Sequence, residues 1–229
     1  MPLTHFDISR DDTWYHAFPD VALTSTGRLV CVFTECTHHG DRSHSHMMYT
    51  WSDDRGRTWV PKIPMNFYGQ VNGCNCPRVF TLRDGTLMAL CDTLQLHVNR
   101  RGVALFTSED NGETWSPPLC TPVWHGMPDR ILELSTGRWL LSAQRRSPYP
   151  PMKHEEGVVY YSDDRGYSWV GPIVYASQPG LWLCEGSLME LPDGTVAAVL
   201  RENSGEGYDA YKTLSKDGGL TWGPVHRMP

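Results

Sequence analysis

The sequence predicts an all-β fold made of four repeated blades of a β-propeller. The motif Ser-x-Asp-x-Gly-x-Thr/Ser-Trp occurs four times, at residues 52–59, 108–115, 162–169 and 215–222. Successive copies start 56, 54 and 53 residues apart, and a repeat of this length is what a four-stranded propeller blade needs. The 9 Trp, 21 Gly and 17 Pro also fit a turn-rich array of strands.

Each repeat begins with two short apolar runs joined by a tight turn that contains glycine, which is the pattern of a β-hairpin. The paired runs are 21–23 with 29–33, 79–82 with 87–91, 131–134 with 139–141, and 188–191 with 196–200. A third run follows in each repeat, at residues 46–51, 103–107, 158–161 and 208–214. The sequence therefore predicts three antiparallel strands before each motif.

A short fourth strand is expected after each motif, where Pro61, Pro117, Pro172 and Pro224 suit an outer edge that does not pair further. In the last repeat we place this strand over residues 222–226. The blades then cover residues 14–65, 74–121, 125–174 and 182–228 of a single domain, 1–229.

Composition excludes several classes of partner. The formal net charge is −6 and the isoelectric point is near 5.9, so no basic excess is available to neutralise nucleic-acid phosphates or a membrane surface. Apolar residues make up 40% of the chain without a long apolar run, which excludes a spanning helix. We expect neither nucleic acid nor membrane as a partner.

The cysteines and the first residues indicate the compartment. The seven cysteines are an odd number, and several of them lie in apolar runs where a thiol behaves as a small hydrophobe. Cys74 and Cys76 have the wrong spacing for a zinc knuckle and no second pair, so no metal and no cofactor is predicted. Residues 1–6 lack the pattern of a secretory signal. If Met1 is the true start, the expected location is cytoplasmic.

The repeated aspartates at positions 54, 110, 164 and 217 are interpreted as structural. Each can accept hydrogen bonds from amides of its own turn, the following Gly permits positive φ, and the Trp can cover an apolar face. A role that recurs once per blade on an outer turn serves the blade and not one active site.

This repeated element is the Asp box, or BNR repeat, and the chain resembles the sialidase (neuraminidase) superfamily. Members of that superfamily build six-bladed propellers around a central sugar site. The Asp box also occurs in other glycosidases and in receptors, so the fold alone does not settle the function. The resemblance implies an exo-glycoside hydrolase that removes terminal sialic acid or a related acidic sugar from a glycan or small saccharide.

A longer match to sialidases lies in the fourth repeat. Residues 184–194 read Cys-Glu-Gly-Ser-Leu-Met-Glu-Leu-Pro-Asp-Gly and residues 200–203 read Leu-Arg-Glu-Asn. Glu185 lies nine residues before Gly194 and Arg201 lies seven after it, so a hairpin brings both to the same end of one blade. By resemblance, Glu185 is the base that activates a tyrosine nucleophile, and Arg201 is one of three arginines that bind the substrate carboxylate.

The residues alone leave a structural alternative open for this pair. Glu185 could cap a strand, and Arg201 could pair with Glu202 or Glu206, as surface charges commonly do.

The first repeat departs from the family. Sialidases have Tyr-Arg-Ile-Pro where this chain has Tyr-His-Ala-Phe-Pro at residues 15–19, so Ala17 stands in place of the first carboxylate-binding arginine. The loop after the second strand still offers Glu35 as a substrate-binding residue and Asp41 as the acid/base. From the residues alone, Asp41 could equally be a turn residue. His38, His39, His44 and His46 crowd this loop, where they can hydrogen-bond a sugar or, less simply, hold a metal.

Further polar residues recur near the starts of the first strands. Asp20, Arg78 and Asp129 are candidate substrate-binding residues, as is Arg130, because propeller geometry gathers such positions around one mouth of the channel. Arg145 and Arg146 follow the second strand of the third repeat much as Arg201 follows that of the fourth. The alternative for each is a strand-end charge without a functional partner.

A six-bladed relative needs two more blades, and by resemblance its tyrosine nucleophile and third arginine lie there, beyond residue 229. We expect this chain to be the first four blades of a six-bladed protein, since residues 3–8 read as an extra strand that would complete a missing blade. A fragment, an incomplete gene product and a closed four-bladed ring are the three possibilities. Two rival functions follow: an exo-glycosidase with another sugar specificity, which could use Asp20, Asp41 or Asp129, and a non-catalytic carbohydrate-binding or interaction propeller.

Overall fold

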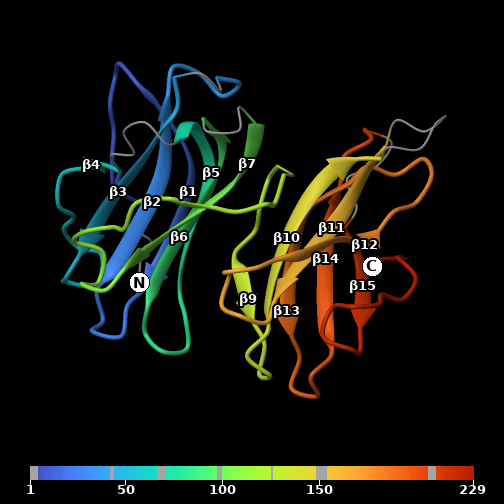
Figure 1. The fold of residues 1–229 in the computed structure, drawn as a ribbon. Helices are drawn as coiled ribbons and strands as arrows, with labels where there is room; N and C mark the ends of the chain where they lie inside the picture. The colour runs from blue at the N-terminus through green and yellow to red at the C-terminus, as the bar shows by residue number, and fades with distance from the viewer. Residues whose placement is uncertain are drawn as a thin grey trace. The chain divides into compact units, whose positions relative to one another are not determined.

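The computed structural model describes residues 5–41, 44–65, 71–96, 100–124, 126–147, 154–205 and 210–229. The chain divides into two compact units, unit 1 (Met1–Arg100 and Ala104–Cys120) and unit 2 (Arg101–Val103 and Thr121–Pro229). Each unit holds two four-stranded antiparallel sheets whose strands neighbour one another in chain order (Figure 1). No helix in the described residues is long and apolar enough to span a bilayer.

Unit 1 contains the first two blades. The strands of the first blade are β1 (Tyr15–Leu23), β2 (Leu29–Cys36), β3 (His46–Ser52) and β4 (Ile63–Pro64). Those of the second are β5 (Val71–Thr81), β6 (Leu87–Gln95), β7 (Arg100–Ser108) and β8 (Leu119–Cys120). One face of each sheet is apolar, and the two faces share a core that includes Val30, Val32, Met47, Val79, Leu87, Ala89 and Phe106.

Unit 2 contains the third and fourth blades. The strands of the third blade are β9 (Ile131–Glu133), β10 (Trp139–Arg146), β11 (Glu155–Ser162) and β12 (Val170–Ala176). Those of the fourth are β13 (Leu183–Glu190), β14 (Val196–Glu202), β15 (Ala210–Ser215) and β16 (His226–Arg227). Their shared core includes Leu140, Val159, Tyr175, Leu188, Val196, Ala198 and Leu200.

The Asp box is a closed turn whose polar groups bond one another. In the first blade, Ser52 Oγ donates to Asp54 Oδ1 at 2.8 Å and accepts the amide of Gly56 at 2.8 Å. Asp54 also accepts the amide of Thr58 at 2.8 Å, and the indole of Trp59 donates to the carbonyl of Gly56 at 3.1 Å. The serine, aspartate and threonine or serine bonds recur in all four blades. The structural interpretation of the repeated aspartates is confirmed.

An arginine fastens the two blades of each unit at their turns. In unit 2, Arg138 donates to both oxygens of Asp163, at 2.7 and 2.9 Å, and to the carbonyl of Gly218 in the next blade at 3.4 Å. In unit 1, Arg28 makes the same contacts with Asp53 and with the next Asp-box turn. Thr86 and Thr195 stand at the matching positions of the second and fourth blades, so this contact belongs to alternate blades.

Several predicted boundaries are wrong. The last outer strand is β16 over only two residues and not 222–226, because Pro224 lacks an amide hydrogen to donate. Residues 5–8 form no strand, and the rest of the predicted terminal strand lies outside the described residues. The predicted run 208–214 begins as β15 at Ala210, since 208 and 209 are also outside. The single-domain organisation stays a prediction.

Candidate active site

The first strand of every blade is preceded or interrupted by a residue in the left-handed region. These residues are Phe18, Cys76, Met127 and Glu185, with φ of 54°, 47°, 51° and 50°. In β1, β5 and β13 the pairing register shifts at this point, which is the signature of a β-bulge. A non-glycine residue with positive φ is strained and persists only where its surroundings hold it. Glu185 is the one charged side chain among the four.

Glu185 and Arg201 are brought together, as the sequence predicted. Arg201 lies opposite Cys184 in the β13–β14 pair, and its Nη1 donates to Glu185 Oε2 at 2.9 Å. Its Nη2 donates to Asn203 Oδ1 at 2.8 Å. The side chains are 37% and 51% exposed for Glu185 and Arg201, so a ligand can reach both. The alternative that Arg201 pairs with Glu202 is wrong for the printed contacts, and Glu206 lies outside the described residues.

The backbone of Glu185 is held by the third blade. Its amide donates to Gln144 Oε1 at 2.8 Å, and Gln144 Nε2 donates to Glu155 Oε2 at 2.8 Å. Gln144 lies seven residues after the turn glycine Gly137, as Arg201 lies seven after Gly194. Counting from these glycines would have identified Gln144, and not Arg145 or Arg146, as the counterpart of Arg201.

Tyr175 packs beneath the same bulge. Its ring is buried, and its hydroxyl lies 2.8 Å from Ser142 Oγ. A Cβ atom on Gly157 or Gly186 would lie 2.6 or 1.9 Å from an atom of the Tyr175 side chain, so both strands approach the ring as only glycine permits. Burial raises the pKa of Tyr175 well above its usual range, against the hydrogen bond from Ser142, which lowers it. A buried phenol of this kind is unsuited to act as a nucleophile.

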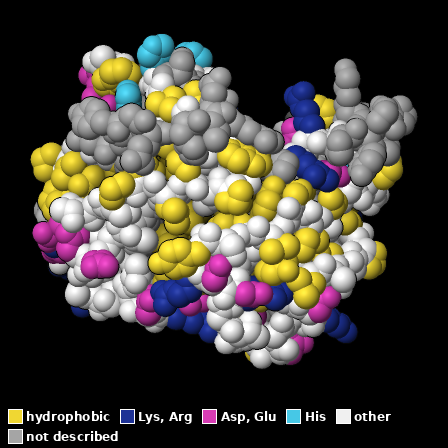
Figure 2. All heavy atoms as spheres, viewed as in Figure 1, with side chains coloured by type: hydrophobic (Ala, Val, Ile, Leu, Met, Phe, Trp, Pro, Cys, Tyr) yellow, Lys and Arg dark blue, Asp and Glu magenta, His cyan; other side chains and the backbone are white. Residues whose placement is uncertain are grey.

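The charged neighbours of Gln144 lie on two faces of the third blade. Arg145 Nε donates to the buried Glu156 at 2.6 Å, which makes Arg145 a partner within the sheet. Glu155, opposite Arg146 in the β10–β11 pair, is partly exposed and lies 3.9 Å from Arg146 Nε. Figure 2 shows basic and acidic side chains at this end of unit 2. The sequence analysis missed Gln144, Glu155 and Tyr175.

The other predicted binding residues of the first strands make structural contacts. Asp20 accepts the amide of Val79 in the second blade at 3.1 Å and that of Val21 at 3.0 Å. Arg78 donates to the carbonyl of Pro77 at 3.0 Å. Asp129 lies close enough to Tyr175 for its charge to raise the phenol pKa further. Their role in substrate binding stays a prediction.

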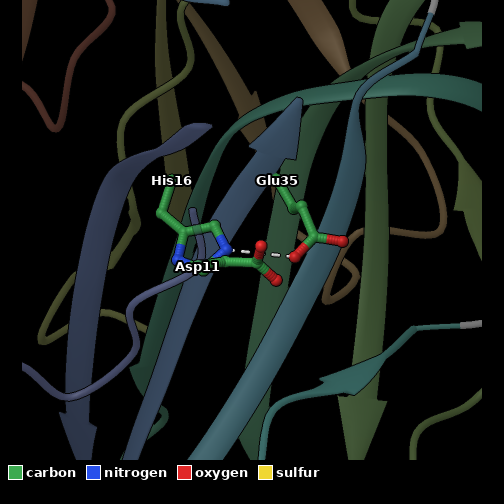
Figure 3. Close-up of side chains that lie close together, drawn as sticks. All are labelled: Asp11, His16 and Glu35. Atoms are coloured by element: carbon green, nitrogen blue, oxygen red, sulfur yellow. Dashed lines mark hydrogen bonds and ion pairs between the residues drawn. The ribbon is translucent and has the colours of Figure 1, made fainter. Parts of the chain in front are cut away.

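Glu35 belongs to a charged cluster in unit 1. It lies 3.0 Å from His16 Nε2 and bonds Lys62, and Lys62 Nζ also donates to Asp11 at 2.8 Å. Figure 3 shows the polar groups of Asp11, His16 and Glu35 pointing toward one another. These three offer ligand atoms within 4.8 Å of one another, but the ammonium of Lys62 already contacts all three groups. The amine thus supplies the positive charge that a metal ion would bring.

The pKa values of this cluster follow from those contacts. The Lys62 hydrogen bond lowers the pKa of Asp11 to about 2. Burial opposes the charge on Lys62, but its bonds to Asp11 and Glu35 outweigh burial and raise the Lys62 pKa. The cluster is therefore a satisfied ion network, and the substrate-binding role of Glu35 stays a prediction.

Asp41 is 6% exposed and closes its own loop. One oxygen accepts the Thr37 hydroxyl at 2.6 Å and the other accepts the amide of His44 at 3.0 Å. These are the bonds of a turn residue, and the acid/base role of Asp41 stays a prediction. Histidine side chains gather at this end of unit 1 (Figure 2), and one of them, His39, lies 3.3 Å from the Tyr15 hydroxyl.

The chain is similar to two curated sialidases. The sialidase of Clostridium perfringens is 25% identical over 238 aligned residues, which cover 85% of this chain and 59% of the relative. That of Paraclostridium sordellii is 26% identical over 186 residues, covering 67% of this chain and 46% of the relative. The chain therefore spans about half the length of the curated relatives it matches.

Solved structures show the same fold. A protein of unknown function from Dyadobacter fermentans is 25% identical with a TM-score of 0.79, covering 96% of this chain and 71% of that one. The NanB sialidase of Streptococcus pneumoniae has a TM-score of 0.67 at 15% identity, covering 100% and 54%. The α-L-arabinanase of Penicillium chrysogenum has a TM-score of 0.70 at 18% identity, covering 93% and 66%.

The predicted fold class is confirmed: the chain is all-β and contributes four blades of a sialidase-type β-propeller. A family model described as a BNR repeat-like domain matches residues 69–229. Since that match covers more than half of the chain, this protein belongs to the BNR repeat-like domain family.

Proposed function

We propose that this chain carries part of the active site of an exo-glycoside hydrolase that removes sialic acid or a related acidic sugar from glycans. Glu185 is the base and Arg201 binds the substrate carboxylate. The observation that carries the proposal is the Glu185–Arg201 ion pair at the open end of the fourth blade, with Glu185 held at positive φ.

Strain at Glu185 supports a functional role for its side chain. The bulge recurs in every blade, so it is part of the architecture, but only the fourth blade places a carboxylate there. The bulge turns the side chain out of the regular strand alternation, and bulges of this kind re-aim side chains at active sites. A base must be aimed at the proton that it abstracts.

Arg201 has a contact that a substrate can replace. Its Nη1 is held by the carboxylate of Glu185, and its Nη2 is held by the neutral amide oxygen of Asn203. A carboxylate accepts a guanidinium hydrogen bond more strongly than an amide does. A sugar carboxylate is therefore expected to displace Asn203 while Glu185 keeps Arg201 in place.

The two sialidase relatives support the substrate class, and the arabinanase neighbour supports glycoside hydrolysis more broadly. The activity of a whole enzyme is part of the proposal, because this chain spans only part of each relative. The tyrosine nucleophile of the resemblance is likewise proposed and not assigned to a residue here.

Release of sialic acid from a fluorogenic sialoside tests this function, using the chain and any longer polypeptide that contains it. Glu185→Gln is expected to lower kcat by roughly 100-fold or more, and Arg201→Lys to raise KM because the bidentate fork is lost. Glu190→Gln is the matched control, since Glu190 ends the same strand and bonds Ser135 at the opposite end. Folded protein that releases no sugar would overturn the proposal.

A second candidate is hydrolysis of a neutral sugar. The observation that favours it is Ala17, which leaves the first blade without the arginine that sialidases have. The protein from Penicillium chrysogenum is described as an arabinanase. Release of arabinose from an aryl α-L-arabinofuranoside, with no release of sialic acid, would move the function to this class. Binding of a glycan without any turnover would leave a carbohydrate-binding module.

A further inference from the structure

Gln144 connects two carboxylates on adjoining blades of unit 2. Its amide oxygen accepts the Glu185 amide at 2.8 Å, and its amide nitrogen donates to Glu155 Oε2 at 2.8 Å. The reverse orientation would set an NH₂ group against an N–H and a carbonyl oxygen against a carboxylate. The orientation of Gln144 is therefore dictated by its partners.

Tyr175 holds the two strands at a common level. Gly157 in β11 and Gly186 in β13 both touch its ring, and Glu155 and Glu185 lie two residues and one residue before these glycines. Side chains of Gln144, Glu155 and Gly157 lie on the same face of the third blade, because Gln144 pairs with Gly157 and strand faces alternate. Glu155 therefore faces the same joint as Glu185.

The two carboxylates have different surroundings. Glu185 bonds the Arg201 guanidinium at 2.9 Å. Glu155 bonds a neutral amide through Oε2, and its nearest printed cation, Arg146, stands 3.9 Å away, beyond hydrogen-bond distance. The Glu155 side chain is 22% exposed, so Oε1 can carry a proton and reach a ligand.

We infer that Glu155 is the proton donor of this site and that Gln144 is the positioning residue that joins it to the base Glu185. This inference rests on the proposed hydrolase function. Glu155 gives its proton to the glycosidic oxygen as the bond from that oxygen to the anomeric carbon breaks. Glu185 takes a proton from the attacking water, whose oxygen bonds to the anomeric carbon. One water is consumed, and exchange with solvent restores both carboxyl groups.

Leaving-group dependence tests the role of Glu155. Loss of a general acid slows substrates with a poor leaving group and largely spares those with a good one. Glu155→Gln is expected to slow an alkyl-linked disaccharide by roughly 100-fold or more and an aryl glycoside by less than about tenfold. Glu156→Gln, on the opposite face, is the matched control and should leave that ratio unchanged. Asp41→Asn tests the competing donor: if it alone changes the ratio, the inference is overturned.

Gln144 is tested apart from the chemistry. Gln144→Met keeps the size but removes both bonds, and it is expected to lower kcat by about 10- to 100-fold through misplacement of Glu185, whereas Gln144→Glu keeps one acceptor. In the wild type, the backbone amide resonance of Glu185 should show two steps with pH, one of them from Glu155 through Gln144. Glu155→Gln and Gln144→Met should each remove that step.

The outcomes separate the two proposals. If wild-type protein hydrolyses glycosides and Glu155→Gln leaves the leaving-group ratio unchanged, the donor role is wrong and the hydrolase function stands. If no glycoside is hydrolysed, the proposed function fails, and the donor role fails with it. The amide titration then decides whether Gln144 couples the two carboxylates: a single step in the wild type would overturn the coupling, and two steps would support it.

Discussion

The phenol oxygen of Tyr175 lies 1.9 Å from the position that a Cβ atom on Gly186 would occupy. Gly186 follows Glu185 directly, so this approach sets how far the bulge of the fourth blade can sink against the third. The Cζ atom of the same ring would lie 3.0 Å from that Cβ. Because Gly186 does not have positive φ, the restriction at this position is steric.

Gly186→Ala is therefore expected to lower the free energy of unfolding by about 1 to 3 kcal/mol or more, as overpacking of a buried joint does. Tyr175→Phe removes the oxygen that the new methyl group meets, so the double variant should recover part of the loss. Denaturant unfolding of the four proteins gives the coupling energy. Strictly additive losses would show that the two residues do not meet.

The scaffold was predictable because its signals are local and repeated. The Asp-box residues bond one another within eight positions, and each copy gives the same signal, so four blades could be read from the spacing. The bulges could not be predicted. Phe18, Cys76 and Met127 are ordinary residues whose positive φ comes from contacts with neighbouring strands and not from their own preference.

The site was predictable only in part, for a similar reason. Glu185 and Arg201 share one hairpin, so the turn at Gly194 brings them together. Gln144 and Glu155 come from another blade, and nothing near them in sequence indicates that they reach Glu185. Asp41 matched a family position in sequence, but its bonds to Thr37 and His44 are made by the loop fold.

Arg138 is expected to stabilise unit 2 by more than an isolated surface ion pair. Besides its two bonds to Asp163, its guanidinium lies 4.4 Å from the Tyr161 ring centre and bonds the next Asp-box turn. Arg138→Ala should cost about 1 to 2 kcal/mol, and Arg138→Lys most of that, because the planar fork is lost. Arg146→Ala, at an exposed position on the same strand, is the control for thermal unfolding. Equal effects of the Arg138 and Arg146 variants would contradict this role.

The Asp boxes predict loss of stability in acid. The Thr221 hydroxyl, together with backbone amides, lowers the pKa of Asp217 from 3.8 to about 2. A carboxyl group whose pKa is lower in the folded protein stabilises it above the ordinary value, and that contribution is lost as the pH falls from about 4 to about 2. Asp217→Asn should thus lower the unfolding midpoint at pH 7 and flatten its decline over this range. Asp12→Asn is the control, because Asp12 is 97% exposed; a decline as steep in Asp217→Asn as in wild type would contradict the assignment.

Replacement of Lys62 tests whether its ammonium fills a cation site. Asp11, His16 and Glu35 are two carboxylates and an imidazole, a donor set that suits divalent transition metals. Lys62→Met removes the amine that contacts all three, so the variant should be less stable without metal, because Asp11 and Glu35 lose their countercharge.

The Lys62→Met variant should also bind Zn²⁺ or Mn²⁺ at least about tenfold more tightly than wild type, and bound metal should raise its Tm by mass action. Titration calorimetry measures the affinity, and His16→Ala in the same background should abolish it, since the imidazole is one of three ligands. Wild-type protein that binds the metal as tightly as the variant would show that Lys62 does not occupy the site. Loss of folding in the variant, reversed by added metal, would support the same conclusion, because a metal ion would then be replacing the charge and contacts of the amine.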